Sequence, residues 1–195
     1  MSESKGNVLF LLLMIINLVA GLVCLFGNVL IITSDLVNLF MKVSSVLSVL
    51  ALIAGMAYIF MGCKKSAVKF FRGFMALYAL NAVANIANAS QSEIGTASTP
   101  VLGLLVNAVV FGLLIVMSVG EDLGKKKSFL VAGLIFAFGV ASLIYTIVIA
   151  PGVAAGGSEL GSLYIIRSAA NLCLASMMGV MTFAKYRDKT RRGTK

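Results

Sequence analysis

The side chains best suited to chemistry in this sequence are an arginine, a lysine and several asparagines inside long apolar stretches. Arg167 and Asn171 are one helical turn apart near the C-terminus, and Lys42 lies in an apolar segment of its own. Hydrocarbon offers a cation no counter-charge, so cations in such segments mark ion pairs or ligand sites. The pattern predicts recognition of an anionic group, or an outer vestibule closed by ion pairs.

Arg167 has two interpretations. Lys185 follows it by 18 residues, which is about 27 Å of helix in a hydrocarbon core roughly 30 Å thick. Arg167 is therefore expected near the outer boundary, where its side chain either extends into the headgroups or turns inward. Turned inward, it should pair with an acid of the outer connections: Glu159, Asp35 or Glu93. Lys42 follows Asp35 by seven residues, so the two share a face if their helix begins at Leu36.

Asparagines recur at helical spacing within the apolar stretches. Asn81, Asn85 and Asn88 form one stripe, and Asn17 and Asn107 lie in two other segments. Lipid cannot satisfy an amide, so these side chains are predicted to point into a bundle. They serve there either as bridges between helices or as the polar lining of a solute path, and the spacing leaves both readings open.

Other chemistry is restricted by what the sequence lacks. Histidine is absent, and the three cysteines show no CxxC spacing. Histidine-ligated metals, histidine-ligated haem and Ser-His-Asp hydrolysis are excluded, and we expect no metal and no cofactor. An enzyme would have to work with carboxylates, lysine, tyrosine or serine alone, so enzymatic activity stays open without positive support.

The composition requires a membrane environment. The 195 residues are 60% hydrophobic and 12% charged, with a mean hydropathy of +1.04; soluble domains are about 45–50% apolar and about 25% charged. We predict an all-α, polytopic integral membrane protein, a bundle of six transmembrane helices in three hairpins, over residues 1–184. The predicted spans are Val8–Ile32, Leu36–Met61, Phe74–Ala89, Val101–Val119, Phe129–Ala150 and Leu163–Ala184.

The distribution of Lys and Arg predicts the orientation. Basic residues fill the second and fourth connections and a tail at 185–195, whereas the other three connections contain none. By the positive-inside rule both termini and the tail are cytoplasmic, in a plasma membrane of the bacterial inner-membrane type. The net charge of +9 is then explained by the flanks of the spans, which predicts contact with anionic lipid and no binding of nucleic acid.

Two functions from different classes fit these features. The first is a small membrane transport protein (a transporter, channel or substrate-binding membrane subunit) for a small neutral or anionic solute. The lack of a carboxylate at the midplane argues against a proton-driven antiporter. The alternative is a non-catalytic assembly, immunity or regulatory subunit. A seam of small residues, Ser44, Ser48, Ala51 and Gly55, could pack within one chain, in a homo-oligomer or against a partner subunit.

Overall fold

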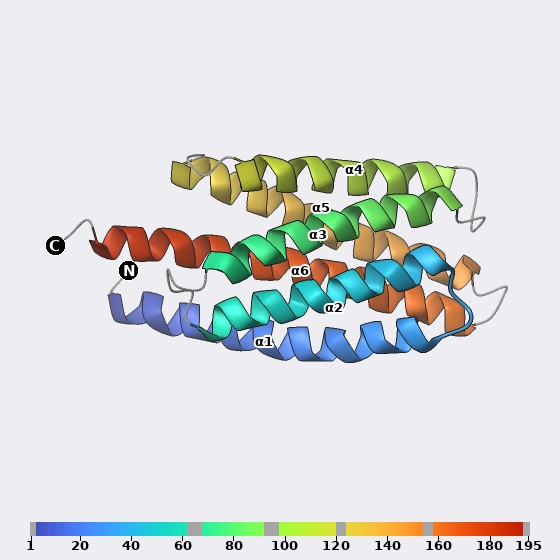
Figure 1. The fold of residues 1–195 in the computed structure, drawn as a ribbon, viewed down its shortest axis with the longest axis horizontal. Helices are drawn as coiled ribbons and strands as arrows, with labels where there is room; N and C mark the ends of the chain where they lie inside the picture. Colours follow the sequence, from blue (N-terminus) through green and yellow to red (C-terminus); the bar gives the residue numbers. More distant parts are fainter. Residues whose placement is uncertain (1–2, 62–67, 92–97, 120–123, 154–157, 193–195) are drawn as a thin grey trace.

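In the computed structural model, the described part of the chain forms six helices. The structure describes residues 3–61, 68–91, 98–119, 124–153 and 158–192, and these ranges contain no strand. The helices are α1 (Glu3–Thr33), α2 (Leu39–Phe60), α3 (Val68–Gln91), α4 (Ser98–Val119), α5 (Gly124–Val153) and α6 (Ser158–Arg192). They lie lengthwise in an elongated bundle, with the start of α1 and the end of α6 at the same end (Figure 1). The predicted all-α class is confirmed.

Length and apolar composition mark this bundle as a multi-pass membrane protein. Five stretches are long and apolar enough to cross a bilayer: Val8–Thr33, Leu39–Phe60, Val68–Ala89, Gly124–Val148 and Glu159–Tyr186. In α4 the described apolar stretch is shorter, Leu104–Ser118. Many large apolar side chains, on α1 above all, face outward. A surface of that kind suits hydrocarbon and would aggregate in water.

The innermost helix is α6. Half of its most apolar stretch is buried (50%), against 17% for α1 and for α5, and it packs against α5, α1 and α2. Two hydroxyl pairs join it to α5: Ser128 with Tyr186, and Thr146 with Ser168, each at 2.8 Å. These pairs give hydroxyl groups in a lipid environment the partners that lipid cannot supply.

The remaining contacts leave one looser region. Each of α1, α2 and α3 packs closely against the helix that follows it, whereas α4 and α5 are much less closely packed. The backbones of α3 and α6 are likewise not closely packed. Long polar side chains cross between α3 and α6, and these side chains form the candidate site.

The start of α2 differs from the predicted boundary at Leu36. The Asn38 side chain accepts a hydrogen bond from the Met41 backbone N–H at 2.9 Å, so the helix begins at Leu39. Such a cap satisfies a backbone donor that has no partner within the helix. Asp35 therefore lies in the preceding turn, and it reaches Lys42 through that turn instead of along a shared helical face.

Both α3 and α6 are longer than predicted. α3 begins at Val68 instead of Phe74, and α6 continues beyond Ala184 to Arg192, through most of the basic tail. Extending an existing helix adds one hydrogen bond per residue without a new nucleus, so a short tail can stay helical although it would not fold alone. Tyr186 also secures this turn by packing against Phe129, with ring centroids 6.0 Å apart.

A substitution at Gly27 tests the close approach of α1 and α6. A Cβ atom on Gly27 would lie 2.5 Å from Cγ2 of Ile166, and a β-branched side chain has little freedom to move away. We expect Gly27→Ala to lower the free energy of unfolding by about 1–3 kcal/mol. The measurement is the unfolding temperature in detergent, followed by circular dichroism because the chain has no tryptophan.

Gly112→Ala on α4 is the matched control, since no atom lies within 4 Å of its Cβ position. Alanine is the better helix former, so this variant should unfold at or slightly above the wild-type temperature. Equal unfolding temperatures for Gly27→Ala and Gly112→Ala would contradict the contact between α1 and α6.

Candidate functional site

Arg167 lies inside the bundle and is bound to an amide. Its side chain is 7% exposed, and Nη2 donates a hydrogen bond to Oδ1 of Asn85 on α3. Tyr164, one turn earlier on α6, lies beside the guanidinium and is hydrogen-bonded to Asn88. Two adjacent turns of α6 are thus joined to two asparagines of the α3 stripe.

A second amide contact lies one turn deeper. Nδ2 of Asn81 donates to Oδ1 of Asn171 at 3.0 Å, and Asn81 is fully buried. Asn81 and Asn85 are four residues apart on α3, as Arg167 and Asn171 are on α6. The crossed pairing of 85 with 167 and 81 with 171 therefore requires antiparallel helices with these faces opposed. We call these four residues the arginine cluster.

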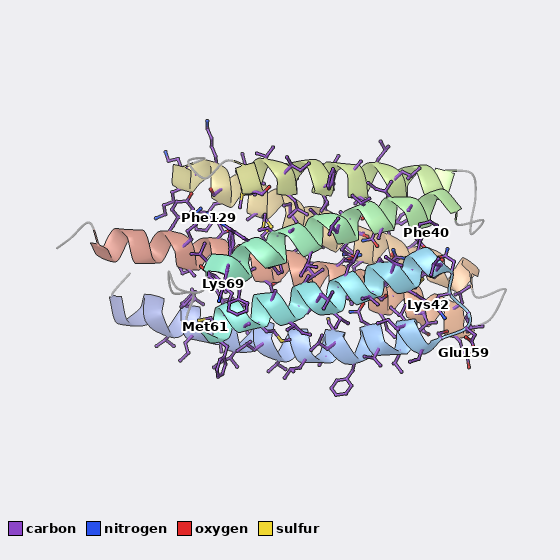
Figure 2. All side chains as sticks on the ribbon, viewed as in Figure 1. Phe40, Lys42, Met61, Lys69, Phe129 and Glu159 are labelled. Carbon is purple, nitrogen blue, oxygen red and sulfur yellow. The ribbon has the colours of Figure 1, made fainter. Side chains whose placement is uncertain are left out.

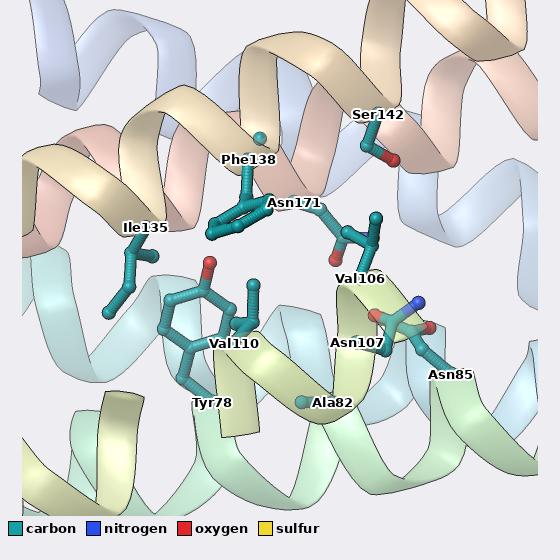
Figure 3. Close-up of a pocket in the computed structure, with 11 residues that line it drawn as sticks. Tyr78, Ala82, Asn85, Val106, Asn107, Val110, Ile135, Phe138, Ser142 and Asn171 are labelled. Atoms are coloured by element: carbon teal, nitrogen blue, oxygen red, sulfur yellow. The ribbon is translucent and has the colours of Figure 1, made fainter. Parts of the chain in front are cut away.

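A small cavity adjoins the arginine cluster. Asn85 and Asn171 line it, together with Asn107 of α4 (Figure 3). Its wall includes the Tyr78 ring from α3 and the Ser142 hydroxyl from α5. The cavity volume is about 20 Å³, which is enough for water but not for an organic solute.

The position of this cavity follows from the helix packing. It lies between α3, α4, α5 and α6, where α3–α6 and α4–α5 are the less closely packed pairs. Amide side chains from α3, α4 and α6 line the space that remains there. A solute larger than water can enter only if these helices separate.

The structure gives Arg167 an amide partner in place of the carboxylate expected from the sequence. Among the described residues, neither Asp35 nor Glu159 lies within ion-pair distance of it, and Glu93 lies outside those residues. Glu159 precedes Arg167 by eight residues, about 12 Å of helix, and its side chain is exposed. Asp35 is fully exposed and lies 3.9 Å from Nζ of Lys42.

Two other predicted site residues lie away from the cluster. Asn17 is buried on α1, but its Nδ2 donates to the Leu13 carbonyl of its own helix at 2.9 Å. Lys42 lies near the end of the bundle that carries Glu159 (Figure 2), where its partner is Asp35. Neither side chain lines the cavity beside the arginine cluster.

Three residues of the site were missed in the sequence, two of them with a recognisable pattern. Tyr78 continues the stripe of Asn81 and Asn85 by one turn, and Tyr164 precedes Arg167 by three residues, so both share faces with predicted site residues. Ser142 had no such pattern, because it is a single small hydroxyl in an apolar segment. Only the packing of α5 against the cavity reveals it.

The cluster is suited to binding and orientation. A guanidinium offers five N–H donors, and an amide offers both donors and an acceptor. The described residues contain no group of three or more His, Cys, Asp or Glu placed to hold a metal ion. No family model, curated protein or solved structure matches this chain. Its function must therefore be argued from the cluster itself.

Asn85 and Asn81 should differ in their contribution to stability. Asn85→Ala removes the acceptor of a buried cation, which we expect to lower the free energy of unfolding by about 1.5–3 kcal/mol. Asn81→Ala removes a bond between two neutral groups and should cost about 0.6–2 kcal/mol. Unfolding temperatures of the two variants in detergent, measured by circular dichroism, compare them directly.

Asn85→Asp shows whether the acceptor for Arg167 is what stabilises the fold, because aspartate keeps both the shape of asparagine and an acceptor oxygen. This variant supplies a carboxylate beside Arg167 and should unfold at a higher temperature than Asn85→Ala. If both Asn85 variants unfolded with the wild type, the contact between Arg167 and Asn85 would have no role in holding α3 to α6.

Proposed function

We propose that this protein is a small membrane transport protein that recognises an anionic solute at the arginine cluster. One observation carries the proposal: the Arg167 guanidinium is buried and is bound by a neutral amide. The transport class covers a transporter, a channel or a substrate-binding membrane subunit.

The physical argument concerns the charge on Arg167. Burying a cation costs several kcal/mol unless an anion compensates it. The amide of Asn85 orients the guanidinium but leaves its net charge in place. An anionic solute would supply the missing charge, and the planar guanidinium suits carboxylate or phosphate oxygens. The sequence left both neutral and anionic solutes open, and the burial of Arg167 favours the anionic class.

The surrounding amides support selectivity. Asn171 and Asn107 line the cavity beside Asn85, so a solute that reached the guanidinium would meet several hydrogen-bonding groups. Sites built from buried amides discriminate well, because a wrong ligand leaves those amides without partners. The exchange of Asn–Asn and Asn–Arg bonds for bonds to a solute is a route by which α3 and α6 would separate.

The proposed threading follows the charge distribution. Lys69, Met61 and Phe129 lie at the end where α1 begins and α6 ends, and Lys42 and Glu159 lie at the other end (Figure 2). We propose that the first end faces the cytoplasm, in a bacterial inner membrane, with six spans. Arg167 is then nearer the outer side, so the cluster would meet solute from outside.

A second function is favoured by one observation, the small volume of the cavity. A space of only about 20 Å³ also suits a membrane assembly, immunity or regulatory subunit, acting as a homo-oligomer or with a partner subunit. In that case the bond between Arg167 and Asn85 would serve to hold α3 against α6.

Cysteine labelling tests the threading. In a variant without the native cysteines, Lys126→Cys should react with a membrane-impermeant maleimide only after the cells are opened. Glu159→Cys should react in intact cells, because it lies at the opposite end of the bundle from the α5 start. The reverse pattern, or reaction of both sites in intact cells, would contradict the proposed orientation.

Transport assays test the role of Arg167. We expect proteoliposomes to exchange at least one of three labelled anions, lactate, succinate or phosphate, and Arg167→Gln to lower that exchange at least tenfold, the effect of about 1.4 kcal/mol. Arg167→Lys should restore it only in part, because an ammonium group lacks the planar fork.

Lys42→Gln is the matched control, since it removes one positive charge at a site away from the cavity and should leave exchange unchanged. The anion should also raise the unfolding temperature of the wild type but not that of Arg167→Gln. If no anion is exchanged or bound and Arg167→Gln changes only thermal stability, the subunit function replaces transport.

A further inference from the structure

A second and larger hollow lies at the other end of α3. Arg72 at this groove and Asn85 in the arginine cluster are 13 residues apart, about 20 Å of helix. The groove is bounded by α2, α3, α4 and α6 and has a volume of about 690 Å³. Pockets of this size bind organic ligands, and neither function proposed above makes use of it.

Two cations from different helices line the groove. Arg72 comes from α3 and Lys185 from α6. Two hydroxyl-bearing residues, Tyr58 and Ser118, complete the polar lining. Arg72 and Lys185 together suit a phosphate, since a guanidinium binds two of its oxygens and an ammonium adds a point charge.

The rest of the lining is largely apolar, and part of it runs along α3 from Arg72 toward the middle of that helix. Met75, Ala76 and Ala79 follow Arg72 along α3, and Met117 lies on α4. Arg72 to Ala79 spans about 10 Å of helix. The two alanines leave room where larger side chains would fill the groove. Two cations next to an apolar wall of this length match the charged headgroup and the apolar chain of a phospholipid.

We propose that this groove binds one anionic phospholipid. The phosphate lies against Arg72 and Lys185, and the upper part of an acyl chain lies along Met75, Ala76 and Ala79. A zwitterionic lipid fits less well, because its headgroup brings a cation toward two cations. The basic connections of the sequence predict nonspecific attraction of many anionic lipids. The groove would instead bind one lipid molecule at a defined position.

The test uses the purified full chain and two lipids with identical acyl chains. We expect native mass spectrometry to show one dioleoylphosphatidylglycerol retained, and this lipid to raise the unfolding temperature more than dioleoylphosphatidylcholine does. Arg72→Gln with Lys185→Gln should weaken retention at least about tenfold, as expected for loss of two charge-assisted contacts. Ala76→Phe, which fills the apolar part without a change of charge, should weaken it as well.

Lys69→Gln with Lys126→Gln is the control, because it removes the same charge at two exposed positions outside the groove. This variant should retain phosphatidylglycerol as the wild type does. Equal loss in the control, or equal retention of the two lipids, overturns the proposal. A competition experiment distinguishes a lipid site from a site for a soluble phosphate. The soluble headgroup glycerophosphoglycerol should fail to displace the bound phosphatidylglycerol. Displacement at equal concentration would assign the groove to a soluble phosphate and also overturn the proposal. If the doubly substituted groove variant does not fold, Ala76→Phe alone decides.

Discussion

The hydrocarbon core of a bilayer has no hydrogen-bonding groups and no counter-charge, so the polar side chains inside this bundle depend on partners within the protein. This constraint explains why the Asn stripe of α3 faces α6 and why two hydroxyl pairs join α5 to α6. Where no neighbour is in reach, the helix itself supplies the acceptor, as the Leu13 carbonyl does for Asn17. The arrangement of the helices is therefore fixed as much by polar contacts as by apolar packing.

The same constraint makes Arg167 the least conventional residue of the interior. An amide can satisfy part of the hydrogen-bonding capacity of a guanidinium, but it cannot neutralise the charge. Stability alone would be served as well by an apolar residue of similar size, because buried ionic groups seldom stabilise a fold more than good packing does. The burial of Arg167 against the neutral amide of Asn85 is the observation that supports the proposed anionic ligand.

Two hollows of the bundle lie beside the loosely packed pair of α3 and α6. One is small, lies beside the arginine cluster and is lined in part by amides. The other is large, lies near the basic end and opens among cations and methionines. They share α3, so lipid bound near Arg72 would contact the helix whose other end carries Asn85.

Composition and the positions of Lys and Arg suffice to predict a helical membrane protein, because the bilayer permits few alternatives and each span needs its own apolar run. The spacing of Asn81, Asn85 and Asn88 likewise places them on one face without any knowledge of the fold. The partners could not be predicted. Whether Arg167 contacts Glu159, Asp35 or an amide depends on the rotation of α6 about its axis and on which helix lies opposite Arg167. Neither can be predicted from local sequence. Helix ends were also decided by contacts, through the Asn38 cap at α2 and the packing of Tyr186 at the end of α6. Periodicity thus determined which faces are polar, and tertiary packing alone decided which of those faces meet.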